Sequence, residues 1–406
     1  MTIKATIYPA VVTILLTLAL CNSKDKTETY NQERNNYFSS SADTLHITAS
    51  RVKGSGVFEF GGGFLDFQDT TNLFDYPIDY PDSLTKILGV RRPVDLNSEI
   101  DKIDIIGGQL PSGDFAVIID QNNNQSFKDD TLISVQPIDW YSSQNSIPVT
   151  FLVSDGVDTF QGRSWIKIGY VDGGILYLRD EYLFASFSIG DKPFDVGIID
   201  ERNGSFTYGV EPQIALLDTE SGKTGPIEIR DLIKLKEYLK LNNVYYRFDS
   251  ISNAGNYLRL IKENNFENKI GIQVGMLAPE FTFKSTSGKA MSTSLLHDKP
   301  LIIANSCGCG GDTESPQAYI EIREAYEDDA YVLGLDSFSK GPSDEWTINM
   351  KDEYNKDCYD KFRQEYCSRI CYVIGQNQRI LDKFPITDWK KNLPKLLSNS
   401  QTAKKH

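Results

Sequence analysis

A short apolar run leads into a turn rich in cysteine and glycine at Leu301-Ile302-Ile303-Ala304-Asn305-Ser306-Cys307-Gly308-Cys309-Gly310-Gly311. Its first five residues are mostly aliphatic, and their position before a turn favours a buried strand. A helix is predicted after the turn, because Tyr319, Ile322 and Tyr326 recur at helical spacing. The stretch therefore predicts a strand, a turn that carries two thiols, and a helix.

The elements predicted further along the chain continue this alternation. Tyr331 to Leu335 is a predicted strand, and Trp346 to Tyr366 is a predicted helical stretch. Ile370 to Ile374 and Arg379 to Phe384 are predicted to form a hairpin. A closing helix, bent or interrupted at Pro394, follows. Alternating strands and helices predict an α/β sheet in this part of the chain.

This order resembles the thioredoxin fold of membrane-anchored redoxins of the TlpA/ResA and AhpC/TSA type. Gly275-Met276-Leu277-Ala278-Pro279-Glu280-Phe281 is similar to the family's opening motif, G-x-x-A-P-x-F, and Lys299 to Asn305 stands where the family has the strand before its active site. Glu314-Ser315-Pro316 resembles the E-x-P of the active-site helix, and Tyr372-Val373-Ile374 with Arg379-Ile380 resembles the last hairpin. The resemblance covers about a third of the chain and implies a thioredoxin-like domain over residues 271–406.

The chain departs from that family at its redox motif. The family has C-x-x-C after an aromatic residue, whereas this chain has Ser306-Cys307-Gly308-Cys309, and Gly311 stands where the second cysteine belongs. The family's cis-proline loop is also changed, because Ile370-Cys371 replaces Pro-Thr. A peroxidase is disfavoured as well, since Ala304 stands where a peroxiredoxin motif has a hydroxyl residue.

The cysteines nevertheless suggest redox chemistry. A turn at the head of a helix stabilises a thiolate, which is the attacking species in disulfide exchange. By analogy with the family, Cys307 is the attacking thiol, Cys309 resolves the mixed disulfide, and Cys371 assists from the cis-proline position. Glu314 and Pro316 support the motif.

Two other interpretations of these cysteines stay open. They are compatible with inert structural disulfides in a binding domain that has lost activity, and Cys-x-Cys with Cys367 and Cys371 is compatible with Cu(I) or Zn. We expect no metal, and no motif calls for a cofactor. Cys358 lies on the apolar stripe of a predicted helix and is interpreted as a core residue. An enzymatic role is therefore one alternative, and a non-catalytic scaffold is the other.

The N-terminus predicts export. Residues 1–20 carry one charge and an apolar run too short to span a membrane, which is typical of a signal peptide. Leu18-Ala19-Leu20-Cys21 resembles a lipobox, which implies that Cys21 is lipidated; a plain secretory signal cut elsewhere is the alternative. Residues 21–45 are predicted to be a disordered tether. We expect a lipid-anchored protein of the bacterial cell envelope, facing the periplasm or the outer surface.

The expected partners follow from that location. Exported proteins with thiols or disulfides would be substrates, and the membrane would hold the anchor. The net charge of −14 argues against a nucleic-acid partner, because nucleic acids are polyanions.

Residues 46–270 are predicted to be β-rich. Runs such as Phe115 to Ile119 and Trp165 to Tyr170 consist of strand-forming residues separated by Gly, Asn and Asp clusters, which suggests a sandwich or a partly open barrel. Tyr245 to Ile261 is a predicted hairpin. Asp231 to Leu241 fits either a helix or two strand ends.

An Asp- and Asn-rich loop in this region has oxygen atoms at alternate positions. Asp120-Gln121-Asn122-Asn123-Asn124, followed by Asp129-Asp130, resembles a calcium loop, and Asp200 with Asn203-Gly204 repeats the pattern weakly. An EF-hand needs Gly and Glu where Gln125 and Thr131 stand. We therefore interpret the loop as a solvated turn.

Overall fold

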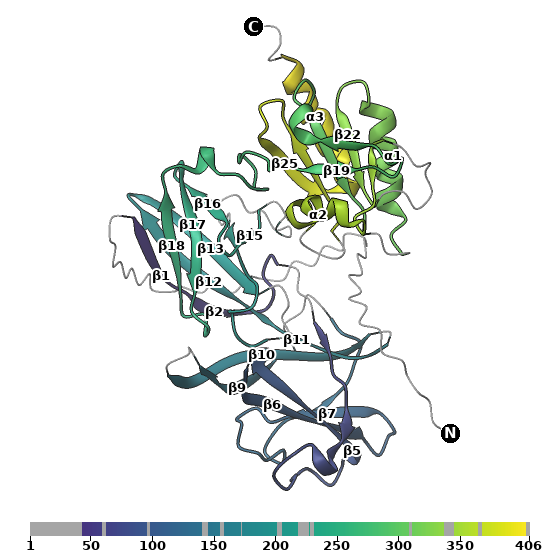
Figure 1. Ribbon diagram of the computed structural model, residues 1–406. Helices are drawn as coiled ribbons and strands as arrows, with labels where there is room; N and C mark the ends of the chain where they lie inside the picture. Colours follow the sequence, from purple (N-terminus) through teal and green to yellow (C-terminus); the bar gives the residue numbers. More distant parts are fainter. Residues whose placement is uncertain are drawn as a thin grey trace. The chain divides into compact units, whose positions relative to one another are not determined.

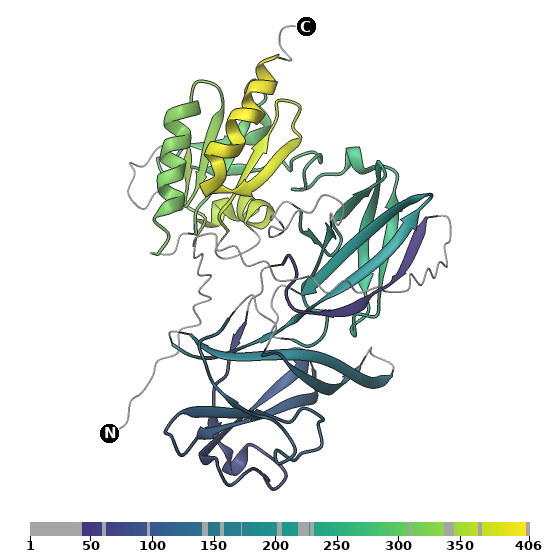
Figure 2. The same ribbon diagram turned by 180° about the vertical axis from the view of Figure 1, so that it is seen from behind.

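The computed structural model describes residues 43–58, 62–95, 98–139, 145–154, 158–171, 173–200, 205–217, 227, 231–307, 311–336, 345–363 and 368–402 (Figures 1 and 2). The predicted signal, Cys21 and almost all of the predicted tether lie outside these residues. None of the helices within the described ranges is long and apolar enough to span a bilayer.

The C-terminal region contains a five-stranded mixed sheet in the order β23-β22-β21-β24-β25. The central strand β21 pairs in parallel with β22 and antiparallel with β24. A separate hairpin, β19–β20, precedes the sheet. The elements of the region are β19 (Thr282–Lys284), β20 (Ala290–Ser292), η3 (Thr293–Leu295), β21 (Leu301–Asn305), α1 (Glu314–Tyr326), β22 (Tyr331–Leu335), β23 (Thr347–Ile348), η4 (Glu353–Asn355), α2 (Lys356–Phe362), β24 (Ile370–Ile374), β25 (Ile380–Pro385), η5 (Ile386–Asp388) and α3 (Trp389–Thr402).

Helices cover both faces of this sheet. Alternate residues of a strand point to opposite faces, and β21 accordingly divides its side chains between two cores. Ile302 and Ala304 pack with α1 and α3, whereas Leu301 and Ile303 pack with α2. Figure 2 shows α1 in green and α3 in yellow next to each other on one side of the sheet. The resulting three layers explain why every residue of β21 is buried.

Most of the predicted elements of this region are present at the predicted positions. The strands at 301–305, 331–335 and 370–374, the helix that contains Tyr319 and Ile322, and the final hairpin are confirmed. The closing helix is confirmed as well, and it runs through Pro394 without a break in its assignment.

The predicted helical stretch from Trp346 is wrong in its first part. Thr347–Ile348 forms the strand β23, which pairs in parallel with β22, and the α-helix begins only at Lys356. The Trp346 ring stacks on Tyr331 with ring centroids 5.1 Å apart. The apolar residues at the start of this stretch therefore pack as part of an edge strand and not on a helix. On α2 itself, Cys358 and Phe362 are the buried residues of the predicted apolar stripe.

Two β-sheets enclose one core in the N-terminal region. The sheets have the orders β1-β18-β17-β16 and β15-β14-β13-β12-β2, and their inner faces share a single apolar cluster. Their strands are β1 (Thr44–Thr48), β2 (Ser50–Lys53), β12 (Glu181–Ile189), β13 (Lys192–Asp200), β14 (Pro212–Leu217), β15 (Ile233–Lys234), β16 (Tyr238–Leu241), β17 (Val244–Ile251) and β18 (Tyr257–Glu263), and η2 (Phe266–Asn268) follows.

A second pair of sheets encloses another core. Their orders are β3-β11-β10-β9 and β4-β5-β6-β7-β8. Strands β6 and β7 are buried on both faces, because a further cluster around Phe127 covers their outer side. The elements are β3 (Gly63–Phe64), β4 (Gln68–Asp69), η1 (Thr70–Asn72), β5 (Thr85–Asp95), β6 (Ser98–Gln109), β7 (Phe115–Ile119), β8 (Leu132–Ser134), β9 (Ile147–Ser154), β10 (Thr159–Val171) and β11 (Gly174–Arg179).

The chain order of these strands is nested. Strands β1 and β2 belong to the first pair of sheets, β3 to β11 form the second pair, and β12 to β18 return to the first. The prediction of a β-rich region is confirmed, and so is the hairpin of β17 and β18. Asp231 to Leu241 forms two short strands, β15 and β16, and not a helix. Lys236 adopts a left-handed conformation (φ 71°) between them, which interrupts any helix there.

Candidate functional site

Cys307 lies at the exit of the central strand. Strand β21 ends at Asn305, and the Ser306 N–H donates to the Leu335 carbonyl over 3.0 Å, which extends the β21–β22 pairing to the turn. Cys307 is 5% exposed and is disulfide-bonded. Its disulfide partner lies outside the described residues, as do Cys309 and Cys367. The structure thus places an oxidised, buried sulfur between the central strand and α1.

Asp312 holds the N–H side of Cys307. Its Oδ2 accepts the Cys307 N–H at 2.9 Å, and its Oδ1 accepts the Ser315 N–H at 3.1 Å and an Arg369 Nη2 at 2.5 Å. Burial alone would raise the pKa of Asp312, but these three donors outweigh it and lower the pKa below the ordinary value. Asp312 is therefore an anion at neutral pH, fixed between the turn, α1 and the start of β24.

Arg363 holds the carbonyl side of Cys307. Its Nη2 donates to the Cys307 carbonyl, and its Nη1 pairs with Asp336. Asp336 directly follows β22, adopts a left-handed conformation (φ 53°) and accepts the Met350 N–H at 2.9 Å. Arg363 is 2% exposed. A buried ion pair consequently joins the end of α2 and the end of β22 to the cysteine turn.

Cys371 does not join this cluster as a reactive thiol. It lies in β24, where its register partners are Ala304 and Phe384, and its side chain belongs to the core under α1 and α3. It is a free, fully buried cysteine, and burial raises the pKa of its thiol. No cis peptide bond occurs within the described residues, so this strand start has no cis-proline geometry. In this conformation Cys371 is a core residue, and its proposed role as an assisting thiol is disfavoured.

The other sequence-selected residues of this region lie where the motif places them. Glu314 and Pro316 are in the first turn of α1, and the Glu314 carboxylate lies 3.7 Å from an Arg369 nitrogen. Cys358 is a free cysteine in the core under α2, which confirms its interpretation as a core residue. Within the described residues no group of three or more His, Cys, Asp or Glu is arranged to hold a metal. The Cys-x-Cys metal interpretation depends on Cys309 and Cys367, which are outside those residues.

Sequence reasoning missed the charged residues around Cys307. Asp312, Asp336, Arg363 and Arg369 belong to no recognised motif, and isolated charges of this kind usually mark a solvated surface. One signal was present in the sequence. Arg363 precedes Cys367 and Arg369 follows it, so one cation lies on each side of this cysteine in the sequence.

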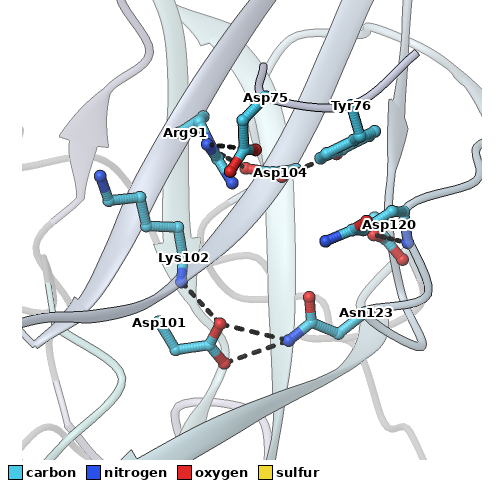
Figure 3. A network of polar contacts seen from close by, with 9 residues as sticks. Asp75, Tyr76, Arg91, Asp101, Lys102, Asp104, Asp120 and Asn123 are labelled. Carbon is cyan, nitrogen blue, oxygen red and sulfur yellow. Dashed lines mark hydrogen bonds and ion pairs between the residues drawn. The ribbon is translucent and has the colours of Figure 1, made fainter. Parts of the chain in front are cut away.

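The Asp- and Asn-rich loop is the second candidate site (Figure 3). Asp120 follows β7 and its carboxylate accepts the N–H groups of Asn124 at 3.0 Å and Gln125 at 2.8 Å. The Asp129 carboxylate accepts the side-chain amides of Asn122 and Asn124, both at 2.9 Å. These hydrogen bonds are those of a self-supporting turn, as interpreted from the sequence, but Asp120 itself is buried and not solvated. Of the weaker repeat, Asn203 and Gly204 lie outside the described residues, whereas Asp200 is buried at the end of β13 and its carboxylate accepts the N–H groups of Val210 at 3.3 Å and Glu211 at 3.1 Å.

A buried polar network lies beside this loop. Asp104 of β6 accepts hydrogen bonds from Tyr76 at 2.7 Å and from Arg91 of β5 at 2.8 Å. Figure 3 shows Asp75 beside the Arg91 side chain, and Asn123 reaching toward Asp101. Asp104 is 4% exposed, so its charge depends on these partners.

Comparisons with known proteins find similarity in structure alone. No family model matches the chain, and no curated protein matches its sequence. Solved structures that resemble about a third of the chain include thiol-disulfide oxidoreductases and 2-Cys peroxiredoxins.

Three of these structures show how low the sequence identity is and how much of each chain is covered. The thioredoxin domain of a thiol-disulfide oxidoreductase from Bacteroides vulgatus is 14% identical, with a TM-score of 0.26 over 31% of this chain and 99% of that chain. The C-terminal domain of a putative thiol-disulfide oxidoreductase from Bacteroides thetaiotaomicron is 16% identical, with a TM-score of 0.24 over 32% and 98%. A reduced 2-Cys peroxiredoxin from Plasmodium vivax is 15% identical, with a TM-score of 0.26 over 33% and 99%.

Proposed function

We propose that this protein is an exported, membrane-anchored thiol-disulfide oxidoreductase or isomerase whose reactive group is the Cys307 disulfide. The observation that carries the proposal is the place of that disulfide. An oxidised cysteine stands in the segment between the end of the central strand and the helix that begins with Glu314. The positive end of a helix at such a junction favours the thiolate form of a cysteine.

The proposed reaction exchanges one disulfide for another. A thiolate of an exported substrate attacks one sulfur of the bond between Cys307 and its partner, for which we propose Cys309, and the other sulfur leaves as a thiolate that takes up a proton. A second substrate thiolate then attacks the mixed disulfide. The substrate dithiol is oxidised to a disulfide, and the protein disulfide is reduced to two thiols. The reverse sequence reduces a substrate disulfide.

The burial of Cys307 favours a second candidate function. Cys307 is only 5% exposed, so a protein substrate has little access to its sulfur. The second candidate is a non-catalytic binding lipoprotein, in which the β-rich region binds a ligand and the C-terminal domain is a degenerate scaffold. In that protein the Cys307 bond would be a structural cross-link.

A redox titration separates the two candidates. The full chain is equilibrated in glutathione or dithiothreitol buffers of stepped potential, free thiols are alkylated, and the Cys307 peptide and its partner are identified by mass spectrometry. We expect a midpoint potential above about −300 mV, which marks a labile pair. A lower potential would show that the Cys307 bond is a structural cross-link. So would a Cys307 disulfide that undergoes no exchange with a substrate disulfide. The Cys358→Ala variant is the matched control, because it removes a buried free thiol from the same domain.

The anchor is a separate part of the proposal. We propose that residues 1–20 are removed and that Cys21 carries the lipid that holds the protein in the cell envelope. Mass spectrometry of the membrane fraction is expected to find a diacylated N-terminal Cys21. A mature protein that starts at another residue, recovered from the soluble fraction, would refute the anchor.

A further inference from the structure

The outer face of one N-terminal sheet carries a group of cations, although the chain as a whole has a net charge of −14. The sheet has the order β1-β18-β17-β16, and Figure 1 shows these strands side by side. Phe248, Leu258 and Leu260 point into the apolar core. Because alternate residues of a strand point to opposite faces, Arg247, next to Phe248, and Arg259, between the two leucines, point outward.

A buried carboxylate lies between these two arginines. The register of β17 with β18 shifts between Phe248 and Ser250, so Asp249 is the extra residue of a β-bulge. A bulge takes a side chain out of the regular alternation of the strand. The side chain of Asp249 is only 5% exposed, and its carboxylate meets the arginines on the outer face.

Three cations converge on this one carboxylate. Arg259 donates to its Oδ2 through Nε at 2.7 Å and also through Nη2. Arg247 Nη2 donates to Oδ1 at 2.8 Å, and Lys236 Nζ donates to the same oxygen at 3.2 Å. Burial opposes the charged form, but hydrogen bonds from Arg259 and Lys236 hold the pKa of Asp249 below its ordinary value. One negative charge therefore balances one of three positive charges, and an excess of two remains.

The three cations keep hydrogen-bond donors that face solvent. The side chains of Lys236, Arg247 and Arg259 are 61%, 38% and 44% exposed. A guanidinium has five N–H donors, and the bulge carboxylate takes two from Arg259 and one from Arg247. Glu263, on the same face, does not cancel the excess charge, because it pairs with Lys269 at 3.0 Å. A second anion can therefore bind here without breaking the contacts to the carboxylate.

An aromatic ring and an imidazole flank the cations. Tyr257 is 54% exposed and precedes Arg259 by two residues in β18, so the two side chains share the outer face about 7 Å apart along the strand. His46 of β1 is the register partner of Arg259 and is exposed on the same face. Aromatic rings stack on flat rings, and an imidazole adds an N–H donor. The face thus combines a place for a compact anion with a surface for the molecule that carries it.

We propose that Lys236, Arg247 and Arg259 bind the phosphate monoester group of a small ring compound, such as a sugar phosphate, whose ring stacks on Tyr257. A phosphate monoester carries a charge of about −1.5 to −2 at pH 7, which matches the excess of two positive charges. Guanidinium groups bind phosphate oxygens through paired hydrogen bonds. The site goes beyond the redox proposal and contains no residue of the C-terminal region. It is the ligand site that the second candidate function requires in the β-rich region.

Isothermal titration calorimetry of the full chain tests the site, with glucose 6-phosphate, inorganic phosphate and glucose as probes in a phosphate-free buffer of about 150 mM ionic strength. We expect glucose 6-phosphate to bind most tightly, inorganic phosphate more weakly and glucose not at all. Equal affinities for glucose 6-phosphate and inorganic phosphate would overturn the assignment to a ring-bearing ester. The absence of heat with both phosphates would overturn the site altogether.

Two variants separate the anion site from the aromatic surface. Arg259→Gln should weaken glucose 6-phosphate binding about tenfold or more, because charge-assisted hydrogen bonds are lost. Tyr257→Ser should weaken glucose 6-phosphate binding severalfold and leave inorganic phosphate unchanged. The matched control is Arg163→Gln, which removes an exposed arginine from β10 of the other pair of sheets and should change neither affinity.

The contrary outcomes are equally specific. Undiminished binding in a folded Arg259→Gln protein, checked by circular dichroism, would overturn the site. A dimer that Arg259→Gln dissociates, in a protein that binds neither phosphate, would overturn it as well and assign this face to a second copy of the acidic chain. None of these results depends on the Cys307 disulfide, so failure of the site leaves the redox titration to decide the proposed function independently.

Discussion

The backbone N–H of Cys307 donates to the carboxylate of Asp312, five residues along the chain, over 2.9 Å. That carboxylate also accepts from Arg369 and the Ser315 N–H, and these contacts hold its pKa below the ordinary value. The turn that carries the disulfide is therefore organised around one ionised aspartate, which gives a first prediction.

Asp312→Asn should destabilise the C-terminal region by about 1–3 kcal/mol at neutral pH, because Arg369 loses its charged partner and the Cys307 N–H loses a charged acceptor. The free energy of unfolding, from urea titration, measures this. An Asp whose folded-state pKa is lowered contributes stability above its unfolded pKa, near 3.8, and loses that contribution as the pH falls through the folded-state value.

The difference between wild type and Asp312→Asn should accordingly be constant above about pH 5 and shrink in more acidic buffer. Glu321→Gln is a suitable control, since that half-buried carboxylate on α1 pairs with the exposed Lys390. A gap that widens on acidification would show that the Asp312 carboxylate does not stabilise the fold as an anion.

The free cysteines give a second prediction. Cys358 and Cys371 are fully buried, and burial raises the pKa of both thiols, so neither is expected to react with iodoacetamide in the folded protein. Labelling should become fast only in denaturant, and its rate should follow global unfolding. Mass spectrometry of each peptide against urea concentration measures this, and native-state labelling of Cys371 alone would restore it as a candidate partner thiol.

A third prediction concerns the buried Asp104 beside the Asp-rich loop. Arg91→Met keeps the aliphatic stem but leaves the Asp104 carboxylate without its cation, and the expected loss is about 3–5 kcal/mol. Burial already raises the pKa of Asp104 in spite of its hydrogen bonds from Tyr76 and Arg91. Urea unfolding of the full chain measures the effect on this pair of sheets.

The double variant Arg91→Met with Asp104→Asn provides the control for that measurement. Removing both charges should cost less than removing the arginine alone, because no buried charge is left unpaired. Equal losses in the single and the double variant would mean that Arg91 acts through packing on Phe74 and Tyr76, over which its guanidinium lies.

A fourth prediction concerns Asp130, whose contribution to stability should change with pH in the opposite direction to that of Asp312. Burial, together with the nearby Asp120 and Asp129 carboxylates, raises the pKa of Asp130 to about 6. A raised carboxyl pKa means that the folded protein binds the proton more tightly than the unfolded chain does. Stability from this group should therefore increase as the pH falls from 7 through 6 toward 4.

Asp130→Asn should remove that pH dependence and stabilise the protein at pH 7 by about 1 kcal/mol, a modest value because the side chain is partly exposed. Thermal unfolding at pH 7 and pH 5 measures both effects, and Asp114→Asn, on an exposed turn, is the control. A protein that is destabilised at pH 7 by Asp130→Asn would contradict the electrostatic interpretation.

Local patterns in the sequence were sufficient for most of the C-terminal elements. The strand of Leu301 to Asn305 and the helix of Tyr319 and Ile322 depend on residues that are close in the chain, and both are present. The same reasoning failed at Trp346, where a helical spacing coincides with a strand that pairs with distant residues of β22. Periodicity cannot distinguish these cases, because the partner of an edge strand lies elsewhere in the sequence.

The β-rich region shows the same limit on a larger scale. Strand-forming runs indicated its class, but β2 pairs with β12, about 130 residues later, around a complete second pair of sheets. No local signal marks such a nested order, since each strand has the same alternation whichever neighbour it pairs with.

The sequence by itself determined most of the elements of the C-terminal region and the position of a cysteine at the turn between its central strand and first helix, because periodicity and turn residues act over a few positions. Only the tertiary structure decided the surroundings of that cysteine. Asp336, Arg363 and Cys307 are brought together by the parallel pairing of β21 with β22 and by the end of α2. Charges that look solvent-exposed in the sequence become buried partners there, because their desolvation is compensated only by groups that folding delivers from other elements.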